Sequence, residues 1–310
     1  MKKKIEKVAV LLGGVSQERN ISLLSGNNIL KSLLKSKINA VPVDTKFFPI
    51  TQLAYQNFTK VFIALHGKDG ENGTVQSILH YLNIPFTGSK TLASAISLNK
   101  LKTKILWKGN NLPIIPFCYI KKNEFKKKFF KIFKKHILPL KLPIIIKPNQ
   151  EGSSIGITIV NKYEYLYKAC KTAFLFDDLI LIEKFIYGQE YTISFLDKTI
   201  LPIIKINLEN NEFYNYQAKY FSKSTKYLCS SGLNTEQELE LKKMALLAWK
   251  TLEGSGWGRI DAIMDYKKRF WLLEANTCPG MTKKSLFPFS AKKAGISFSE
   301  LVKQILELAN

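Results

Sequence analysis

The sequence predicts an α/β protein of more than one domain, and two observations carry that prediction. Over residues 1–99, apolar segments of strand length alternate with longer segments of helical periodicity, which is typical of a parallel sheet flanked by helices. Residues 259–276 form two short apolar segments separated by a polar tetrad, the pattern of a β-hairpin. With 310 residues, 46% of them hydrophobic, the chain is long enough for two or three small domains.

Composition narrows the class of protein. The formal charge is +23, but only three of the 47 basic residues are arginine, and the lysines are spread along the whole chain. Nucleic-acid surfaces concentrate their charge and favour arginine, so we attribute the charge to compositional bias and expect no nucleic-acid partner. No apolar run reaches the roughly 18 residues of a membrane helix, so no membrane association is expected. Four separated cysteines without a C-x-x-C pair argue against a zinc site or a disulfide framework and fit a reducing cytoplasm.

The first apolar segment follows a basic start, which imitates a signal peptide. It lacks a small-residue cleavage site and runs into Gly13-Gly14, so we interpret residues 7–12 as a first strand. Further strands are expected at 38–44 and 61–65. A helix is expected at about 18–35, and its inward-facing residues are expected to be Ile21, Leu24, Ile29, Leu30 and Leu33.

Two glycine-rich segments, 13–16 and 66–73, follow strands of this predicted sheet. A ligand is therefore expected near them, at the carboxyl ends of the strands. Glu18 lies just after the first segment, where it either binds a substrate ammonium or only complements the positive end of the helix dipole. His66 likewise either contacts substrate or completes the hydrogen bonding of its own loop.

A glycine- and serine-rich loop, residues 148–156, lies between strands predicted at 142–147 and 157–160. Such a loop presents backbone N–H groups and hydroxyls to phosphate oxygens, and Lys147 at its start adds a positive charge. The loop contains G-x-S-x-G, but a nucleophile elbow requires a helix directly afterwards, and here a strand follows. The chain also lacks the G-x-x-x-x-G-K-[ST] phosphate loop.

The densest lysine run, 121–136, carries apolar residues at near-helical spacing. It is either a membrane-surface helix or a packed helix with a lysine-covered outer face, and we expect the packed helix. Asn161 and Glu164 resemble a capping box that opens a helix ending near residue 176. Strands are expected at 112–120, 179–186, 191–196 and 199–206.

Residues 207–234 show little regular pattern, and a loop of this length in a compact protein is usually functional. Its four tyrosines argue against simple disorder. We therefore interpret the segment as a mobile lid, with Lys219 and Tyr220 reaching inward.

Two helices are expected after this segment. The first is amphipathic, covers 235–253 and ends at Gly254, a residue typical of helix C-termini. The second covers 298–309 and begins at a capping box formed by Ser297 and Glu300.

The hairpin at 259–276 is a candidate metal site. If the turn is centred on its polar tetrad, Asp261 faces Glu274, Arg259 faces Asn276, and all four side chains project from one face. Opposed carboxylates repel each other, and a divalent cation between them converts that repulsion into binding. Oxygen ligands of this kind suit Mg²⁺, which usually shares its shell with substrate phosphates. The alternative is a solvated polar face on which Arg259 offsets the acids.

The hairpin, the glycine- and serine-rich loop, the nearby lysines and the lid together point to chemistry on a nucleoside triphosphate. The sequence also resembles the D-alanine–D-alanine ligases of the ATP-grasp superfamily from end to end. Eight stretches, in the family's order, carry the resemblance: VAVLLGGVSQERNISLLSG, VFIALHGKDGENGTVQ, SLNKLKTK, IIIKPNQEGSSIG, LIEKFIYGQEYT, FYNYQAKYFS, GWGRIDAIMD and LLEANTCPGMTKKSL.

The resemblance implies a three-domain ATP-grasp fold. An N-terminal parallel α/β substrate domain (1–99) is followed by two α+β domains (100–183 and 184–310) that enclose ATP. It implies a cytoplasmic, homodimeric enzyme of peptidoglycan precursor synthesis. ATP phosphorylates the carboxylate of one D-alanine, and the amine of a second D-alanine attacks the resulting D-alanyl phosphate.

The resemblance also implies roles for residues at the matching motif positions. Metal ligands for two Mg²⁺ ions, with Mn²⁺ as an alternative, are Asp261, Glu274 and Asn276. Nucleotide contacts are Lys100, Lys147 and Lys219 to phosphates, Glu183, Lys184 and Ile186 to adenine, and Glu190 to ribose. Substrate and catalytic contacts are Glu18, His66, Ser153, Tyr220, Arg259, Gly280, Ser285 and Leu286. Among these, Glu18, Ser153 and Tyr220 form a hydrogen-bonded triad, and Arg259 and the Gly280 N–H form an oxyanion hole.

Five positions depart from the commoner family pattern: Asn20, Gln150, Phe185, Cys278 and Lys284. Glutamate, arginine, tryptophan, serine and histidine, respectively, are frequent there. Tyr220 favours the dipeptide product, since relatives that form a D-alanyl-D-lactate ester tend to lack this tyrosine. Two alternatives stay open: another ATP-grasp ligase joining a different carboxylate and amine, and a basic nucleic-acid-binding protein on an enzyme fold.

Overall fold

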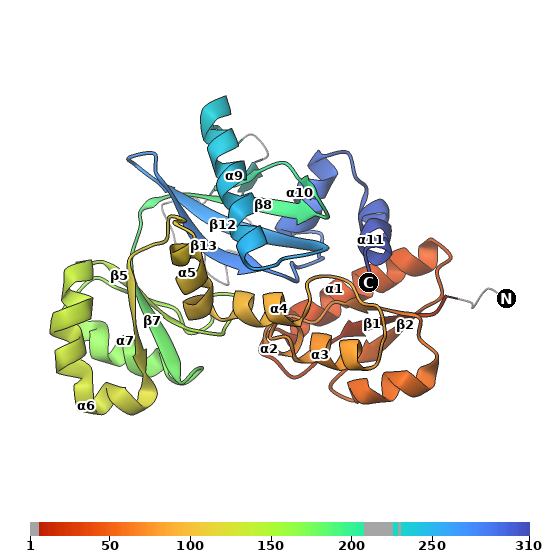
Figure 1. Ribbon diagram of the computed structural model, residues 1–310, viewed down its shortest axis with the longest axis horizontal. Helices are drawn as coiled ribbons and strands as arrows, with labels where there is room; N and C mark the ends of the chain where they lie inside the picture. The colour runs from red at the N-terminus through yellow and green to blue at the C-terminus, as the bar shows by residue number, and fades with distance from the viewer. Residues whose placement is uncertain (1–5, 208–225, 229–230) are drawn as a thin grey trace.

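A computed structural model describes residues 6–207, 226–228 and 231–310. Its strands form three sheets, which lie along the molecule one after another (Figure 1). A three-stranded sheet occupies one end, a four-stranded sheet the other, and a six-stranded sheet the middle. The α/β class is confirmed, whereas the domain limits after residues 99 and 183 stay a prediction. Within the described residues, no helix combines the length and apolar character needed to cross a membrane.

The first sheet is parallel, as the alternating pattern predicts. Its order is β2-β1-β3, formed by Ala40–Asp44, Val8–Leu12 and Lys60–Ile63. Every residue of β1 is buried, which is usual for the central strand of a parallel sheet covered on both faces. The glycine-rich segments after β1 and β3 lie at the carboxyl ends of these strands, where a ligand was expected.

Helix α1 (Arg19–Lys35) packs on this sheet, and of its predicted inward residues Ile21, Ile29 and Leu33 are buried while Leu30 is partly buried against the same core. Leu24 is 56% exposed, so its inward assignment is wrong. The inner face also carries small residues, and α1 approaches β1 closely at one of them: a Cβ on Gly26 would lie 2.5 Å from Leu12 Cβ. Ser22 is fully buried and satisfied, since its hydroxyl donates to Ala64 O and accepts from Gly13 N.

Further short helices complete this part of the chain. They are the 3₁₀ helix Ile50–Gln56, α2 (Lys68–Glu71), α3 (Thr74–Tyr81) and α4 (Thr91–Leu98). The last two helices of the chain, α10 (Leu286–Lys293) and α11 (Phe298–Glu307), pack into the same hydrophobic core. Helix α11 lies beside α1 (Figure 1). Half of the predicted capping box is present: the Ser297 hydroxyl accepts from Glu300 N, but Glu300 Oε1 accepts from Gln304 Nε2.

The four-stranded sheet is antiparallel, in the order β4-β7-β5-β6. Its strands are Phe117–Lys121, Leu179–Lys184, Ile144–Pro148 and Thr158–Val160, and helix α5 (Lys100–Gly109) precedes them. The lysine run forms α6 (Lys122–Ile132) and a following π-helical turn. Its residues Phe125, Phe129 and Phe133 pack in the core of this sheet, so the packed-helix interpretation is confirmed.

The predicted capping box at Asn161 is wrong. A 3₁₀ turn at Tyr163–Tyr165 precedes α7 (Leu166–Ala173), and neither element begins with a side-chain cap. Glu164 lies 4.0 Å from Lys162 instead of reaching back to a helix N-terminus.

The six-stranded sheet has the order β11-β10-β8-β12-β13, with β9 paired to β8. In chain order the strands are β8 (Gly188–Leu196), β9 (Thr199–Ile200), β10 (Ile204–Asn207), β11 (Lys226–Leu228), β12 (Trp257–Asp265) and β13 (Phe270–Asn276). The single strand predicted at 199–206 is divided in two at Pro202, which has no N–H for a sheet ladder.

Alternation gives this sheet one apolar and one polar face. Opposed pairs such as Ile193 and Ile260 are buried against α9 (Thr235–Thr251), which covers one face (Figure 1). The opposite face pairs Thr192 with Asp261 and Ser194 with Arg259. The polar face is therefore left for the candidate site.

Two details around α9 and the hairpin differ from prediction. Glu253, with φ of 56°, is the residue after α9 that adopts the left-handed conformation. Position 254 requires glycine for a different reason, because a Cβ there would lie 2.3 Å from the Trp249 ring. In the hairpin, Asp261 pairs with Glu274 as predicted, but a bulge after Asp261 brings Ala262 opposite Leu272. The predicted pairing is thus confirmed for Arg259 with Asn276 and Asp261 with Glu274, and it is wrong from Ala262 to the turn.

Candidate active site

Two adjoining cavities open on the polar face of the six-stranded sheet. The smaller, of about 90 Å³, lies between the first sheet, the 148–156 loop and the end of the hairpin. The larger, of about 500 Å³, lies between the four-stranded and six-stranded sheets. Lys100, Gly152 and Glu274 line both cavities, so a group bound in one can reach a group bound in the other at these residues.

The hairpin brings its predicted residues to this junction. Asp261 lines the larger cavity, Asn276 the smaller, and Glu274 both. The Arg259 Nε and Nη2 atoms donate to the two Asp261 oxygens, each at 2.7 Å. Lys100 Nζ lies 4.0 Å from Glu274 Oε2. Arg259 therefore balances the charge of Asp261, as the alternative interpretation of the hairpin expected, and it does so beside the three candidate metal ligands.

The donor set fits a divalent cation. Asp261, Glu274 and Asn276 offer only oxygen ligands to a metal, and Asp261 and Glu274 are cross-strand neighbours whose negative charges would otherwise repel. The Asn276 side-chain oxygen also accepts a hydrogen bond from Cys278 N at 3.0 Å, which orients the amide. The arrangement suits Mg²⁺, which prefers oxygen ligands.

The 148–156 loop has an unusual backbone conformation. Ser153, Ser154 and Gly156 all have positive φ values, of 49°, 60° and 70°. Two adjacent non-glycine residues in this region are unusual, and such conformations cluster at ligand sites. Strand β6 follows the loop, so the rejection of a nucleophile elbow is confirmed.

Behind this loop lies a buried charge cluster. Lys147 Nζ and Lys104 Nζ lie 2.9 and 3.2 Å from Glu183 Oε1. Burial lowers the pKa of Lys104 to about 8, although the nearby Glu183 charge acts to raise it. Burial acts to raise the pKa of Glu183, but the two lysines outweigh it and hold that pKa below its usual value. The sequence analysis did not single out Lys104. Its position four residues after Lys100 on the same helix places both lysines on one face, and this spacing could have indicated it.

Glu18 and Ser153 meet in the smaller cavity. The Ser153 hydroxyl donates a hydrogen bond to the Glu18 carboxylate, across 135 residues of sequence. Gly152 permits this approach, since a Cβ there would lie 2.5 Å from Glu18 Oε2. Glu18 makes no side-chain cap to its own helix, so its carboxylate is directed to the cavity rather than to α1.

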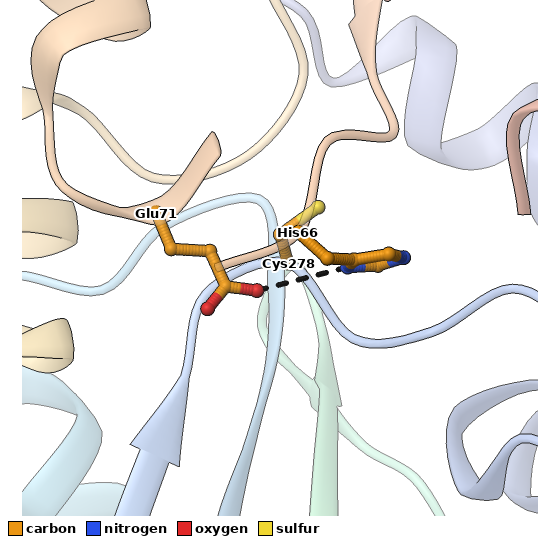
Figure 2. Close-up of side chains that lie close together, drawn as sticks. All are labelled: His66, Glu71 and Cys278. Atoms are coloured by element: carbon orange, nitrogen blue, oxygen red, sulfur yellow. Dashed lines mark ion pairs between the residues drawn. The ribbon is translucent and has the colours of Figure 1, made fainter. Parts of the chain in front are cut away.

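His66 also lines the smaller cavity, beside Glu71, which sequence reasoning missed. His66 Nε2 lies 3.0 Å from Ser25 Oγ, and His66 Nδ1 lies 3.7 Å from Glu71 Oε1. Figure 2 shows the Glu71 carboxylate pointing toward the His66 ring, with Cys278 beside them. Burial raises the pKa of both the Glu71 carboxyl and the Cys278 thiol.

The far wall of the smaller cavity is formed by Gly280, Ser285 and Leu286. Ser285 is the N-cap residue of α10, and its hydroxyl accepts from Thr282 N at 3.0 Å. A Cβ on Gly280 would lie 2.8 Å from Ser285 Oγ, so glycine lets the loop backbone come close to this hydroxyl.

The larger cavity combines an apolar pocket with polar edges. The predicted residues Lys184, Ile186 and Glu190 line it, as does Phe185, whose ring packs edge-on to Tyr187 at 4.8 Å. The apolar lining also includes Ile115, Ile145, Ile263 and Leu273, which sequence reasoning did not single out. Lys219 and Tyr220 lie outside the described residues.

Two family profiles match the chain. One described as D-ala D-ala ligase C-terminus matches residues 106–307, and one described as D-ala D-ala ligase N-terminus matches residues 49–89. A D-alanine–D-alanine ligase of Buchnera aphidicola subsp. Baizongia pistaciae is 71% identical over 305 residues, which cover 98% of each chain.

Solved structures give the same result. The crystal structure of D-alanine–D-alanine ligase from Bacillus anthracis matches with a TM-score of 0.86 at 34% identity, covering 98% of this chain and 97% of that one. The Bacillus anthracis ligase complexed with ATP matches with a TM-score of 0.85 at 32% identity and the same coverage.

Proposed function

The chain belongs to the D-alanine–D-alanine ligase family, and we propose that it joins two D-alanine molecules into D-alanyl-D-alanine while ATP is converted to ADP and phosphate. The observation that carries this proposal is the junction of the two cavities at Lys100, Gly152 and Glu274. A small substrate in one cavity and a nucleotide in the other would meet there.

ATP fits the larger cavity. Adenine would lie among Ile145, Ile186 and Leu273, with the backbone of 183–186 reading its edge and Glu190 binding the ribose hydroxyls. The triphosphate would then extend toward the 148–156 loop, where Lys100 and Lys147 offer positive charge. Lys219 is proposed to join them from the lid.

The metal ligands at the junction are proposed to be Asp261, Glu274 and Asn276, for two Mg²⁺ ions or Mn²⁺. Bound metal would neutralise charge that develops on the transferred phosphoryl group. Arg259 and Lys100, which balance the acids here, would remain close enough to act on the same charge.

The first D-alanine fits between Glu18 and the junction. Glu18 would bind its ammonium and, with Ser153 and Tyr220, form the proposed triad, while His66 contacts the substrate from the first sheet. The substrate carboxylate would point to the γ-phosphate of ATP. Transfer breaks the bond between the γ-phosphorus and the bridging oxygen, so ADP departs and D-alanyl phosphate forms.

The second D-alanine fits near Ser285 and Leu286. Ser285 lies at the N-terminus of α10, where a substrate carboxylate gains from the hydroxyl and the positive end of the helix dipole. Its amine, as the free base, attacks the acyl carbon. Arg259 and the Gly280 N–H would stabilise the tetrahedral oxyanion, whose collapse expels phosphate and leaves the amide.

Localisation and assembly complete the proposal. Cys118, Cys170 and Cys278 are free thiols, which supports a cytoplasmic enzyme. The proposal of a homodimer that forms through the first 99 residues rests on the family resemblance. The D-alanyl-D-alanine product would be used in peptidoglycan precursor synthesis.

Phosphate release from ATP tests the reaction. We expect release that requires Mg²⁺ and D-alanine, with L-alanine inactive. Equal rates with both enantiomers would overturn the proposal. Release that depends on a D-hydroxy acid as second substrate would favour an ester-forming ligase, and salt-sensitive polyanion binding without ATP turnover would favour the nucleic-acid alternative.

A further inference from the structure

His66, Glu71 and Cys278 form a compact cluster, of which the proposed reaction uses only His66. His66 lies in the loop between β3 and α2, Glu71 ends α2, and Cys278 lies in the loop after β13 (Figure 2). One ligand atom of each lies within 4.8 Å of the other two, and His66 Nδ1 and Glu71 Oε1 are 3.7 Å apart. His66 and Cys278 are each 4% exposed.

The chemistry of these three groups differs from that of the magnesium site. Imidazole nitrogen, thiolate sulfur and carboxylate oxygen together suit Zn²⁺ and similar transition metals, whereas Mg²⁺ prefers oxygen alone. A tetrahedral zinc with bonds of about 2.0–2.3 Å holds its ligands roughly 3.3–3.7 Å apart. The His66–Glu71 pair already has that separation, and the most distant pair must approach by about 1 Å.

The surroundings support the cluster as a metal site. Ser25 Oγ lies 3.0 Å from His66 Nε2 and accepts a hydrogen bond from Met281 N at 3.1 Å. This contact holds the ring so that Nδ1 faces Glu71. Metal-binding histidines are usually oriented through their second nitrogen in this way.

An ion has a route to the cluster. His66 and Glu71 line the smaller cavity, which also contains Glu18 and Ser153. A metal held by three protein ligands keeps a fourth position, and two of the three ligands here, His66 and Glu71, border the cavity. The absence of a C-x-x-C pair argued against a zinc site in the sequence. That criterion detects only ligands that are close together in the sequence, whereas Cys278 is far from His66 and Glu71.

We propose that His66, Glu71 and Cys278 bind one Zn²⁺-class ion, and that the bound ion obstructs the smaller cavity. Binding releases to solvent the Cys278 thiol proton and the extra proton of a charged His66 imidazole, and leaves a water in the fourth position. The binding stands independently of the reaction, whereas the obstruction rests on the proposed function of the smaller cavity.

Cobalt is the probe for binding, because Co²⁺ in a tetrahedral sulfur-containing site absorbs strongly. The intact, purified protein is titrated with Co²⁺ in excess Mg²⁺, which keeps the oxygen site of Asp261 and Glu274 occupied. We expect a sulfur-to-cobalt charge-transfer band that saturates at one equivalent and disappears with one equivalent of Zn²⁺. The band is expected to be lost in Cys278→Ser and kept in Cys170→Ser, which alters another buried thiol. No band, or an unchanged band in Cys278→Ser, would overturn the site.

X-ray absorption of the zinc-loaded wild-type protein serves if Cys278→Ser does not fold. One sulfur at about 2.3 Å among nitrogen or oxygen neighbours is expected, and a shell without sulfur overturns the site.

Turnover tests the obstruction. Zn²⁺ added to saturating MgATP is expected to raise the KM for D-alanine at least tenfold in the wild type, and Cys278→Ser is expected to need at least tenfold more Zn²⁺. Sulfur-ligated zinc without this effect would overturn the obstruction alone. A protein that binds zinc but never releases phosphate would contradict the proposed function instead.

Discussion

Lys104 and Glu183 form an ion pair of 3.2 Å in which each side chain is only 1% exposed. Lys147 lies 2.9 Å from the same carboxylate oxygen, so one buried negative charge faces two lysines. Lys147 lines the larger cavity, whereas Lys104 lies behind it. The pair therefore supports the wall of the proposed nucleotide site from inside.

Glu183→Gln is expected to destabilise the protein by about 3–5 kcal/mol, since it leaves two lysines buried without a counter-charge. Urea denaturation measures this as a lower midpoint with an unchanged slope. A loss below about 1 kcal/mol would contradict the buried cluster.

Lys104→Met is the matched variant. It removes the excess positive charge and the desolvation of a buried ammonium while retaining the Glu183–Lys147 pair, so we expect a change within about 1 kcal/mol of zero or a gain in stability. A loss comparable with that of Glu183→Gln would show that the whole triplet, rather than the charge balance, is required.

Glu274→Gln is expected to lower turnover at least about 10²-fold, because the residue lies where the two cavities meet and a neutral amide is a poor Mg²⁺ ligand. Circular dichroism and thermal unfolding should stay near wild type. The control is Glu240→Gln, which changes an exposed glutamate on α9 and should leave turnover unchanged. Retained turnover in Glu274→Gln would mean that the hairpin does not hold the metal.

Glu18→Gln is expected to raise the KM for the first D-alanine roughly 10- to 100-fold, the cost of weakening one hydrogen bond to a charged group. Ser153→Ala removes the donor that orients Glu18 and should have a smaller effect in the same direction. Steady-state kinetics at saturating ATP separates the two D-alanine sites. An unchanged KM in both variants would leave Glu18 as a structural carboxylate.

Asp265→Asn is expected to cost about 2 kcal/mol, because Asp265 accepts hydrogen bonds from Lys267 N, Arg269 N, Arg269 Nε and Trp271 Nε1. These contacts outweigh burial and lower the pKa of Asp265 to about 2. The stabilisation is therefore present above the unfolded value near 3.8 and is lost as the pH falls toward 2. The variant should show a smaller loss of stability than wild type between pH 4 and pH 2.

The alternation of side chains along each strand was sufficient to predict which residues of the hairpin face one another at the candidate metal site. Alternation placed Arg259, Asp261, Glu274 and Asn276 on one face, and the structure has the predicted cross-strand pairs. The bulge after Asp261 was not predictable, because the turn is fixed by hydrogen bonds to Asp265 rather than by the position of the polar tetrad.

Other differences come from close packing. Helical periodicity alone gave Leu24 an inward position, but Leu24 is 56% exposed. The residue that meets Leu12 of β1 is Gly26, and a glycine at such a close approach adds nothing to an apolar pattern. Gly254 was taken for a helix stop, whereas its need for glycine arises from Trp249. Contacts such as Ser153 to Glu18 span more than a hundred residues, so only the family resemblance indicated them.

The packing of α10 and α11 into the first core has a consequence for synthesis on the ribosome. The strands of the first sheet are complete at Ile63, but α11, which covers part of their core, begins at Phe298. At about 5–20 residues per second, the nascent chain waits on the order of 10–50 s for that cover. During this interval the part of α1 that packs against α11 lacks that cover, so its apolar residues are available to a cellular chaperone.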